Sequence, residues 1–475
     1  MQLKMGEVAR ILAASCAVPE SRALGYSIDS RTILPSALFF AIRGPRFNGH
    51  DFVARAFEHG AAGAVVERAF AETAPQSLAP KLIAVDDTTE ALQRLARAVR
   101  QKWGHRVVAV TGSAGKTTTK ELIAALLSAG LTVHKSPGNL NNEYGLSLSL
   151  LDLEPEHDVA VLELAMSAPG EIARLARLAE PEVGVVTNVA PAHLQFFGSV
   201  DEIARAKREL IENLKQPAVA VLNYDDVQVR RFADGFSGRV LTYGFEEGAD
   251  VRAFHLRQNI GNGFGTVSQF IVAAGGNSDE FLLPLLGRHN VQNALAAIAT
   301  ASLFDIPAEE LRTALASFDG LDQRGEILSL PSLITVINDS YNSNPLAMTR
   351  MLETLASWPG AGRRIVVAGE MLELGPTAPE LHRQVGRRCV ESRVDWLIAV
   401  QGDAVSFLEG AILAGMPRQR TRFFRDAETA GEFCRELVRP LDLVLVKGSR
   451  AVHLEKVVGS LQSPERGRAE SGAMS

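Results

Sequence analysis

The chain has 475 residues, of which 46% are hydrophobic and 22% are charged. Because a typical domain has roughly 150 residues, this length predicts about two to four folded domains. The ordinary composition excludes both a small disulfide-stapled module and a largely disordered chain.

The three cysteines, Cys16, Cys389 and Cys434, are irregularly spaced. This excludes a disulfide framework and a cysteine metal cluster, and it favours a reducing, cytoplasmic location. No apolar run reaches the ~18 residues that a membrane span needs, so we expect no membrane association. Residues 104–320 contain 17 basic and 26 acidic residues. This acidic excess argues against a nucleic-acid partner and is compatible with a metal-assisted site.

Strand-length apolar runs alternate with helical segments along most of the chain, which predicts an α/β fold with largely parallel sheets. The first block, residues 1–103, is predicted to be a small α/β domain. Its strands are expected at 37–42 and 62–66, and its helices at 51–59 and 90–103.

The second block, residues 104–320, is predicted to be a central domain with a mostly parallel sheet. A strand at 106–110 leads through a glycine-bearing turn into a helix at 116–128. The later elements are strands at 159–164, 183–188 and 219–223 and a helix at 200–214.

The third block, residues 321–475, shows the repeated strand and helix units of a doubly wound, Rossmann-like domain, but contains no G-x-G-x-x-G dinucleotide motif. Its strands are expected at 333–338, 365–367, 396–400 and 443–446. The polar segment 463–475 lacks periodicity and is predicted to be disordered.

The segment 107–119, VVAVTGSAGKTTT, predicts a phosphate-binding loop. A β-branched strand precedes the small residues Gly112, Ser113, Ala114 and Gly115, whose backbone N–H groups can surround a phosphate at a helix start. Lys116 then supplies positive charge and Thr117 a hydroxyl for Mg²⁺. The alternative is an ordinary glycine-rich turn, but the order of strand, turn, Lys-Thr and helix favours the phosphate loop.

Two possible metal ligands lie where neighbouring strands of this block end. Glu163 ends the predicted strand 159–164, and His193 follows the strand 183–188. Ligands of open α/β sheets bind at the carboxyl ends of strands, so both side chains could converge on the phosphate loop and hold a divalent cation. The alternatives are a solvated strand-end glutamate and a histidine packed in a loop.

Lys207 interrupts the apolar stripe formed by Ile203, Leu210, Ile211 and Leu214 on the predicted helix 200–214. A buried ammonium is costly unless it is paired or loses its charge, so a functional or modified lysine is one hypothesis. The other is that the side chain snorkels outward to solvent.

Two segments are dense in asparagine. Residues 136–145 place Asn139, Asn141 and Asn142 between Pro and Gly, and Asn290 and Asn293 lie three residues apart on one face of a predicted helix. The first segment is either a turn or a substrate-binding loop. An asparagine near a helix start is usually a cap.

Together these segments resemble the Mur ligase family over nearly the whole chain. The resemblance rests on shared motifs: TGSAGKTTT at 111–119, Glu163, TNVAPAH at 187–193, Lys207 within AKRE, HNVQN at 289–293 and KGSR at 447–450. Further motifs of one member type are DSR at 29–31, GPRFNGHD at 44–51, GNLNNE at 138–143, NDSYNSNP at 338–345 and GEMLELG at 369–375.

The resemblance implies ATP and Mg²⁺ as cofactors and a role for each matching residue. Lys116, Lys207 and His193 would be catalytic. The expected ATP-binding residues are Gly112, Ser113, Ala114, Gly115, Lys116, Thr117, Thr118, Asn290, Asn293, Arg324 and Asp339. Among these, Asn290 and Asn293 match the pair that contacts adenine in the family. The expected metal-binding residues are Thr117, Glu163, His193 and Lys207, the last as a carbamate. The expected substrate-binding residues are Asp29, Ser30, Arg31, Asn141, Asn142, Tyr341 and Asn342.

The activity that the resemblance implies is ATP-dependent addition of D-alanyl-D-alanine to UDP-N-acetylmuramoyl-tripeptide through an acyl phosphate, by a monomer, in cytoplasmic peptidoglycan precursor synthesis. The first block would hold the uridine nucleotide, the second ATP and the third the dipeptide. Three alternatives remain. One is the related ligase that adds the third amino acid, although the chain has no Asp-Asn-Pro-Arg motif. The others are a folylpolyglutamate synthase and a nucleotide-binding switch that does not ligate.

Overall fold

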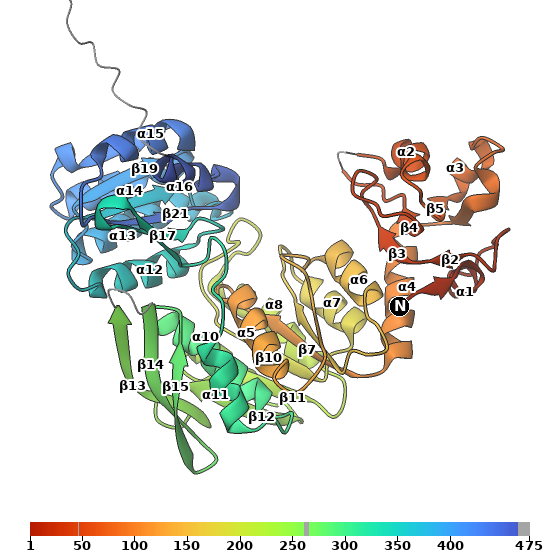
Figure 1. Cartoon of the computed structure of the whole chain (residues 1–475), viewed down its shortest axis with the longest axis horizontal. Coiled ribbons are helices and arrows are strands. Elements are labelled where there is room, and N and C mark those ends of the chain that lie inside the picture. The colour runs from red at the N-terminus through yellow and green to blue at the C-terminus, as the bar shows by residue number, and fades with distance from the viewer. Residues whose placement is uncertain (46, 261–265, 464–475) are drawn as a thin grey trace, which may run out of the picture.

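The computed structural model describes residues 1–45, 47–260 and 266–463, which form three α/β blocks (Figure 1). The predicted disorder of the tail falls almost entirely on residues 464–475, outside the described part of the chain. Among the described residues, no helix is both long and apolar enough to cross a membrane.

The first block is built on a four-stranded parallel sheet in the order β3-β4-β5-β6, with the strand pair β1-β2 beside it. The strands are β1 (Leu3–Lys4), β2 (Arg22–Ala23), β3 (Gly25–Ser27), β4 (Ala37–Phe40), β5 (Gly63–Glu67) and β6 (Leu82–Val85). The helices are α1 (Met5–Ile11), α2 (Val53–Glu58), α3 (Arg68–Thr73) and α4 (Thr88–Trp103). The predicted α/β unit is confirmed, with strand β4 ending two residues earlier than expected.

Helix α4 connects the first block to the second (Figure 1). It begins two residues before the predicted start because the side chain of Asp87 accepts hydrogen bonds from the N–H groups of Thr89 and Glu90 and so caps it. Its buried Leu92 and Leu95 belong to one continuous hydrophobic cluster with residues of helices α6 (Glu143–Leu151) and α7 (Glu171–Ala179) in the second block. The first two blocks are therefore joined by buried apolar packing as well as by the chain.

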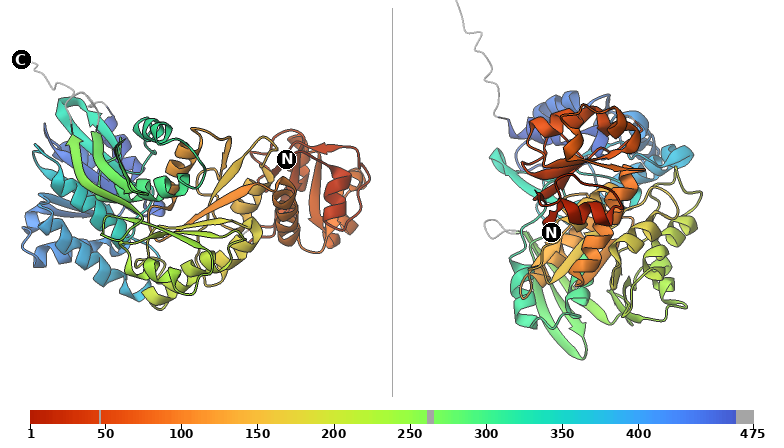
Figure 2. Two further views of the ribbon diagram at one scale, coloured as in Figure 1. Left: turned by 90° about the horizontal axis from the view of Figure 1, so that it is seen from below. Right: turned by 90° about the vertical axis from the view of Figure 1, so that its right-hand side faces the viewer.

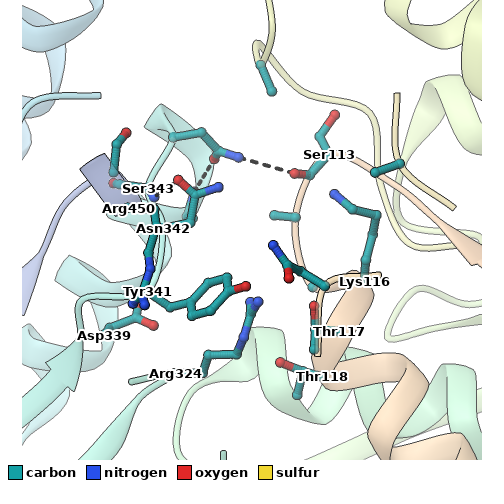
Figure 3. A pocket seen from close by; sticks show the side chains of 18 of the residues that line it. Ser113, Lys116, Thr117, Thr118, Arg324, Asp339, Tyr341, Asn342, Ser343 and Arg450 are labelled. Atoms are coloured by element: carbon teal, nitrogen blue, oxygen red, sulfur yellow. Dashed lines mark hydrogen bonds between the residues drawn. The ribbon is translucent and has the colours of Figure 1, made fainter. Parts of the chain in front are cut away.

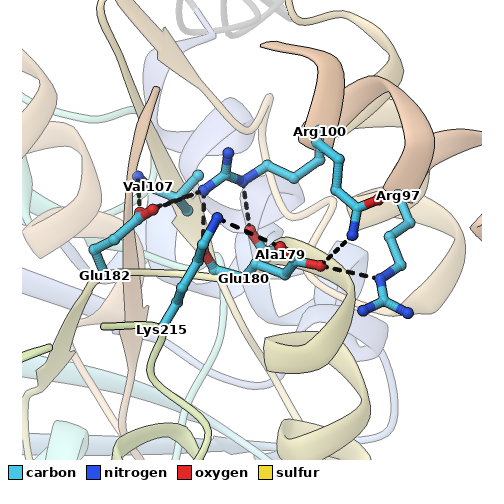
Figure 4. Close-up of polar contacts among 8 residues, drawn as sticks. Arg97, Arg100, Val107, Ala179, Glu180, Glu182 and Lys215 are labelled. Carbon is cyan, nitrogen blue, oxygen red and sulfur yellow. Dashed lines mark hydrogen bonds and ion pairs between the residues drawn. The ribbon is translucent and has the colours of Figure 1, made fainter. Parts of the chain in front are cut away.

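Arg100 adds polar contacts to this junction (Figure 4). Its side chain is fully buried, and its guanidinium donates to the carbonyls of Ala179 and Glu180 at 2.7 and 3.0 Å and to the carboxylate of Glu182 at 3.2 Å. The same carboxylate accepts from the N–H of Val107 at 2.8 Å. These contacts hold the end of α4 against the start of strand β7 (Arg106–Thr111).

The central block contains a nine-stranded sheet in the order β15-β14-β13-β12-β11-β10-β7-β9-β8. The strands are β7 (Arg106–Thr111), β8 (Val133–Lys135), β9 (Val159–Glu163), β10 (Val183–Val186), β11 (Val219–Asn223), β12 (Arg239–Gly244), β13 (Val251–Ile260), β14 (Thr266–Ala274) and β15 (Asn277–Leu283). Pairing is parallel from β8 to β13, as predicted, and antiparallel for β13-β14 and β14-β15. Strands β8, β12, β13, β14 and β15 were not predicted from the sequence.

Helices cover both faces of the parallel part of this sheet (Figures 1 and 2). The buried residues of α5, α10 and α11 form one hydrophobic cluster on one face, and those of α6, α7 and α8 form another on the opposite face. The helices are α5 (Lys116–Leu127), α6 (Glu143–Leu151), α7 (Glu171–Ala179), α8 (Val200–Glu212), α9 (Val227–Arg230), α10 (Arg288–Ala301) and α11 (Ala308–Ala316).

The third block has a six-stranded sheet in the order β16-β17-β21-β18-β19-β20, parallel except for the pair β16-β17. The strands are β16 (Glu326–Leu330), β17 (Ile334–Asp339), β18 (Arg364–Gly369), β19 (Trp396–Val400), β20 (Thr421–Phe424) and β21 (Leu443–Lys447). The helices are α12 (Pro345–Ser357), α13 (Ala378–Glu391), α14 (Val405–Leu413), α15 (Ala427–Leu437) and α16 (Glu455–Gln462). Helices α12 to α14 pack on one face and α15 and α16 on the other, which confirms the doubly wound fold.

Candidate active site

A cleft of about 480 Å³ lies between the central and third blocks and is lined by residues of both. In Figure 3, Ser113, Lys116 and Thr117 lie on one side of it, and Arg324, Tyr341 and Asn342 lie on the other. The cleft faces the carboxyl ends of β7, β9, β17 and β21. This is the edge at which open parallel sheets bind ligands.

The predicted phosphate loop connects β7 to α5, and two of its glycines are required by close contacts. Gly112 has φ +152°, and a Cβ there would lie 1.8 Å from Oγ1 of Thr187. Gly115 has φ +82°, and its Cβ would lie 2.5 Å from Oδ1 of Asn293. A side chain at either position would displace the loop or its neighbour.

Residues at the end of β10 hold the loop in this shape. The amide of Asn188 accepts from the N–H of Ala114 and donates to its carbonyl, both at 2.9 Å. The hydroxyl of Thr187 also donates to the carbonyl of Ala114, at 2.7 Å. Thr187 and Asn188 were given no role from the sequence. They belong to the segment that ends in His193, and their position at the end of the predicted strand 183–188 was the available signal.

The ammonium of Lys116 lies over the loop and donates to the carbonyl of Gly112 at 2.9 Å. Burial lowers the pKa of Lys116, while the negative charge of Glu163 acts in the opposite direction. A lysine in this position can neutralise the charge of phosphate oxygens that enter the loop.

Oxygen donors converge beside the loop. The carboxylate of Glu163 accepts from the hydroxyl of Thr117 and from the amide of Asn141, each at 2.7 Å. Carboxylate and hydroxyl oxygens suit Mg²⁺, which usually completes its octahedron with waters and substrate phosphates. No group of three or more His, Cys, Asp or Glu among the described residues could hold a metal by itself. The donors therefore fit a magnesium ion that is bound together with a nucleotide.

His193 also lines the cleft, and it contacts the third block. Its Nδ1 lies 2.5 Å from Oε2 of Glu373, and the carbonyl of Glu373 accepts from the N–H of Gln195 at 3.0 Å. The hydrogen bond to His193 lowers the pKa of the Glu373 carboxyl. The sequence analysis did not assign Glu373 to the site, although it lies in the GEMLELG segment.

Lys207 lies on α8, with 2% of its surface exposed. Burial lowers the pKa of its amine well below the usual value, and the charge of Lys116 adds to the effect. The side chain is almost entirely buried and does not extend outward into solvent, so the snorkelling hypothesis is wrong. No hydrogen bond or ion pair to its amine is found within the described part of the chain.

The two predicted adenine-contacting residues lie at the start of α10. The amide of Asn290 donates to the carbonyl of Leu286 at 2.7 Å, and the amide of Asn293 donates to Oδ1 of Asn290 at 3.3 Å. Both side chains line the cleft, as does the neighbouring His289. Burial lowers the pKa of His289 to about 3, so its ring is neutral at pH 7.

The third block contributes a cationic and aromatic wall. The guanidinium of Arg324 lies 4.0 Å from the centre of the Tyr341 ring, a cation–π contact. Lys447, at the end of β21, donates to the carboxylate of Asp339 at 2.6 Å and to the carbonyl of Asn342 at 2.8 Å. Lys447 was quoted within a motif of the sequence but given no role in the site.

The remaining predicted residues divide into two groups. Thr118 lines the cleft. Asp29, Ser30 and Arg31 lie in the first block and do not line the cleft; Asp29 pairs with Arg31 at 2.7 Å, which lowers the pKa of its carboxyl to about 2. Asn142 is exposed and caps α6 by accepting from the N–H of Gly145 at 2.9 Å, while its neighbour in sequence, Asn141, contacts Glu163.

Three family models match the chain: the Mur ligase middle domain over residues 110–301, the Mur ligase glutamate ligase domain over 323–450 and the Mur ligase family catalytic domain over 24–100. The chain therefore belongs to the Mur ligase family. Ligases of this family are ATP-dependent and form ADP and phosphate, and this chain is one of them.

Within the family, the chain is similar to enzymes named UDP-N-acetylmuramoyl-tripeptide--D-alanyl-D-alanine ligase. It is 35% identical to that of Bacillus subtilis (strain 168) over 441 residues, which covers 93% of each protein. It is also 35% identical to that of Escherichia coli (strain K12) over 439 residues, 91% of this chain and 92% of the relative.

Solved structures of MurF enzymes are also similar to this chain. A crystal structure of MurF from Acinetobacter baumannii superposes with a TM-score of 0.87 at 29% identity, over 97% of this chain and 99% of that one. The structure of MurF ligase from Thermotoga maritima in complex with ADP gives a TM-score of 0.80 at 29% identity, over 92% and 97% of the two chains.

Proposed function

We propose that the chain forms the amide bond between UDP-N-acetylmuramoyl-tripeptide and D-alanyl-D-alanine, with hydrolysis of ATP to ADP and phosphate, in the synthesis of peptidoglycan precursors. The relatives that match more than nine-tenths of the chain carry this activity in their names. The structural observation that carries the proposal is the placement of Lys116, Thr117 and Glu163 across one cleft from Arg324 and Asp339.

The proposed reaction has two steps. First, an oxygen of the tripeptide's terminal carboxylate attacks the γ-phosphorus of ATP, and the bond from that phosphorus to the bridging oxygen of ADP breaks. The amine of the dipeptide then attacks the acyl phosphate carbon, and the tetrahedral intermediate loses phosphate and a proton to give the amide. Lys116 stabilises the charge of the transferring phosphoryl group.

A bound Mg²⁺ would neutralise phosphate charge beside Thr117 and Glu163. The third block contributes by closing the cleft, since the Arg324 and Tyr341 wall faces the phosphate loop and restricts access of water to the reacting groups (Figure 3). Exclusion of water protects an acyl phosphate from hydrolysis.

We assign the three substrates to three domains with boundaries near residues 103 and 320. Asp29, Ser30 and Arg31 would bind the uridine nucleotide in the first domain. The tripeptide and dipeptide ends would contact Asn141, Asn142, Tyr341 and Asn342. We further propose that the enzyme works as a monomer in the cytoplasm and binds no nucleic acid.

Lys207 is proposed to carry a carbamate. Burial lowers the pKa of its amine well below the usual value and so favours the neutral form. A neutral amine can attack the carbon of CO₂, forming a C–N bond and releasing one proton. The product is an anion. It would replace the repulsion between Lys207 and Lys116 with attraction and help to hold a metal near the phosphate loop.

The experiment that tests the substrate assignment is a panel read by product mass. Purified enzyme with Mg-ATP is offered the UDP-linked dipeptide or tripeptide, each with either a single amino acid or D-alanyl-D-alanine. We expect one product, with the mass of the tripeptide nucleotide plus the dipeptide minus water. A product from the UDP-linked dipeptide and a single amino acid would instead identify the related ligase.

A further inference from the structure

The contact between His193 and Glu373 joins two blocks at the edge of the cleft. The Nδ1 of His193 lies 2.5 Å from Oε2 of Glu373, although the residues are 180 positions apart in the chain. A second hydrogen bond, from the N–H of Gln195 to the carbonyl of Glu373, fixes the backbones of the same two loops at 3.0 Å. The backbone hydrogen bond of Glu373 therefore helps to hold its carboxylate against the imidazole of His193.

Both partners have unfavourable backbone conformations. His193 has φ +57° and Glu373 has φ +64°, which is the left-handed region that non-glycine residues rarely adopt. Gly375 has φ +59° and packs against Gln195, where a Cβ would lie 3.1 Å from its Cα. Such conformations are strained and persist where the surrounding structure enforces them, commonly at functional sites.

The contact determines which nitrogen of His193 can bind something else. With Nδ1 occupied by the carboxylate, Nε2 remains for a ligand in the cleft, whose lining includes His193. Histidines that bind metals usually donate their other ring N–H to a carboxylate or carbonyl, which fixes the tautomer and the orientation of the ring. The geometry at His193 matches this arrangement.

We propose that Glu373 is a positioning residue that orients His193 as a metal ligand when the third domain closes on the central one. This inference rests on the proposed function, because the metal in question is the one that accompanies ATP. Since Glu373 comes from the third domain and His193 from the central one, the ligand is correctly oriented only in the closed enzyme. The metal site would then be complete only when the reacting groups are shielded from water.

The test measures metal binding without turnover. Mn²⁺ is titrated into the full-length enzyme with a non-hydrolysable ATP analogue and UDP-tripeptide, and free Mn²⁺ is followed by electron paramagnetic resonance. The variants are Glu373→Ala, Glu373→Gln and, as a matched control, Glu455→Ala. Glu455 likewise accepts a hydrogen bond from a histidine in the left-handed backbone region, His453 with φ +58°, at 3.2 Å. This pair lies within one domain and outside the cleft.

We expect Mn²⁺ to bind to the wild-type enzyme together with the ATP analogue. Glu373→Ala should weaken this binding by about 10- to 100-fold, the usual effect of removing a carboxylate behind a metal-binding histidine. The Mn²⁺ affinity of Glu373→Gln should lie between those of wild type and Glu373→Ala, because the amide oxygen can still accept a hydrogen bond from Nδ1 of His193. Glu455→Ala should match wild type. Wild-type enzyme that binds no more Mn²⁺ than the ATP analogue does alone, or equal binding by Glu373→Ala and Glu455→Ala, would overturn the proposal.

Two further measurements separate positioning from other roles. With ligands bound, the radius of gyration of Glu373→Ala should equal that of wild type, because the backbone contact with Gln195 remains. A variant that stays open would show that Glu373 acts only through domain closure, which would contradict a positioning role. In steady-state kinetics, kcat should fall while KM for ATP stays within about threefold, and Glu373→Gln should recover part of kcat. If the wild-type enzyme does not join D-alanyl-D-alanine to the UDP-tripeptide, the proposed function fails. If the wild-type enzyme makes this product and the Glu373 variants behave like it, only this inference fails.

Discussion

Gly115 of the phosphate loop lies against Asn293 of α10, so close that a Cβ on the glycine would be 2.5 Å from the amide oxygen. The contact brings the loop expected to hold phosphates next to the asparagine expected to contact adenine. Gly115 is required here for two reasons: its φ of +82° is rarely adopted by other residues, and there is no room for a side chain. The two ends of a nucleotide site therefore depend on each other.

We expect Gly115→Ala to weaken ATP binding by at least about tenfold, since the methyl group must displace either Asn293 or the loop. The control is Gly170→Ala. Gly170 also precedes a helix and has φ +80°, but its Cβ would meet nothing within 4 Å. Both variants bear a similar backbone cost, so equal ATP affinities in calorimetry would show that the contact with Asn293 has no role.

The second prediction concerns the junction between the first two blocks (Figure 4). Arg100→Met leaves Glu182 and two carbonyls without their buried donor, and we expect it to lower the free energy of unfolding by about 3–5 kcal/mol. The neighbouring Arg97 is 56% exposed and pairs with Glu180 at 3.0 Å. Arg97→Ala should cost less than about 1 kcal/mol. Denaturant unfolding measures both, and similar losses would contradict the importance of burial.

The third prediction follows from the buried amine of Lys207. Enzyme equilibrated with ¹³C-bicarbonate should show a carbamate carbon resonance that is absent from Lys207→Met. The same substitution should lower kcat by about 10- to 100-fold if the carbamate supports a metal. A wild-type spectrum identical to that of the variant would exclude the modification, whatever the activity of the variant.

The fourth prediction is a pH dependence of stability. Burial lowers the pKa of His134 to about 4 and that of His289 to about 3, whereas an unfolded histidine titrates near ~6.5. Below that pH the unfolded chain binds more protons than the folded one. Each histidine should therefore lower the free energy of unfolding by up to about 1.4 kcal/mol per pH unit as pH falls from 6.5 towards its folded pKa.

Denaturant titrations at pH 7, 6 and 5 test this dependence. His134→Gln should flatten the loss of stability towards low pH relative to wild type. His105→Gln replaces an exposed histidine and should keep the wild-type slope. The explanation fails if removing His134 leaves the pH dependence unchanged.

Contiguous patterns predicted the phosphate loop, because the strand, the small residues and Lys116 follow one another in sequence. Glu163 and His193 were found by the rule that strand ends meet at one edge of a sheet. Lys447 and Glu373 could not be paired in this way, since their partners lie 108 and 180 residues away. The Lys447–Asp339 pair depends on the insertion of β21 between β17 and β18, and a single sequence does not reveal strand order.

Strands β14 and β15 were missed for a different reason. Their buried residues alternate with exposed or half-buried ones, as is common for antiparallel strands with one solvated face. Continuous apolar runs, which indicate parallel strands buried on both faces, are absent from this pattern. Lys207 shows the opposite case: its place on an apolar helix face was visible in the sequence, and the structure confirms that the side chain is buried.

The most direct test of the proposed ligase is ADP release by purified enzyme supplied with Mg-ATP and UDP-N-acetylmuramoyl-tripeptide, with and without D-alanyl-D-alanine. The account predicts little release without the dipeptide, and steady release with it that matches the amount of amide formed. ATP turnover that is indifferent to D-alanyl-D-alanine would contradict it.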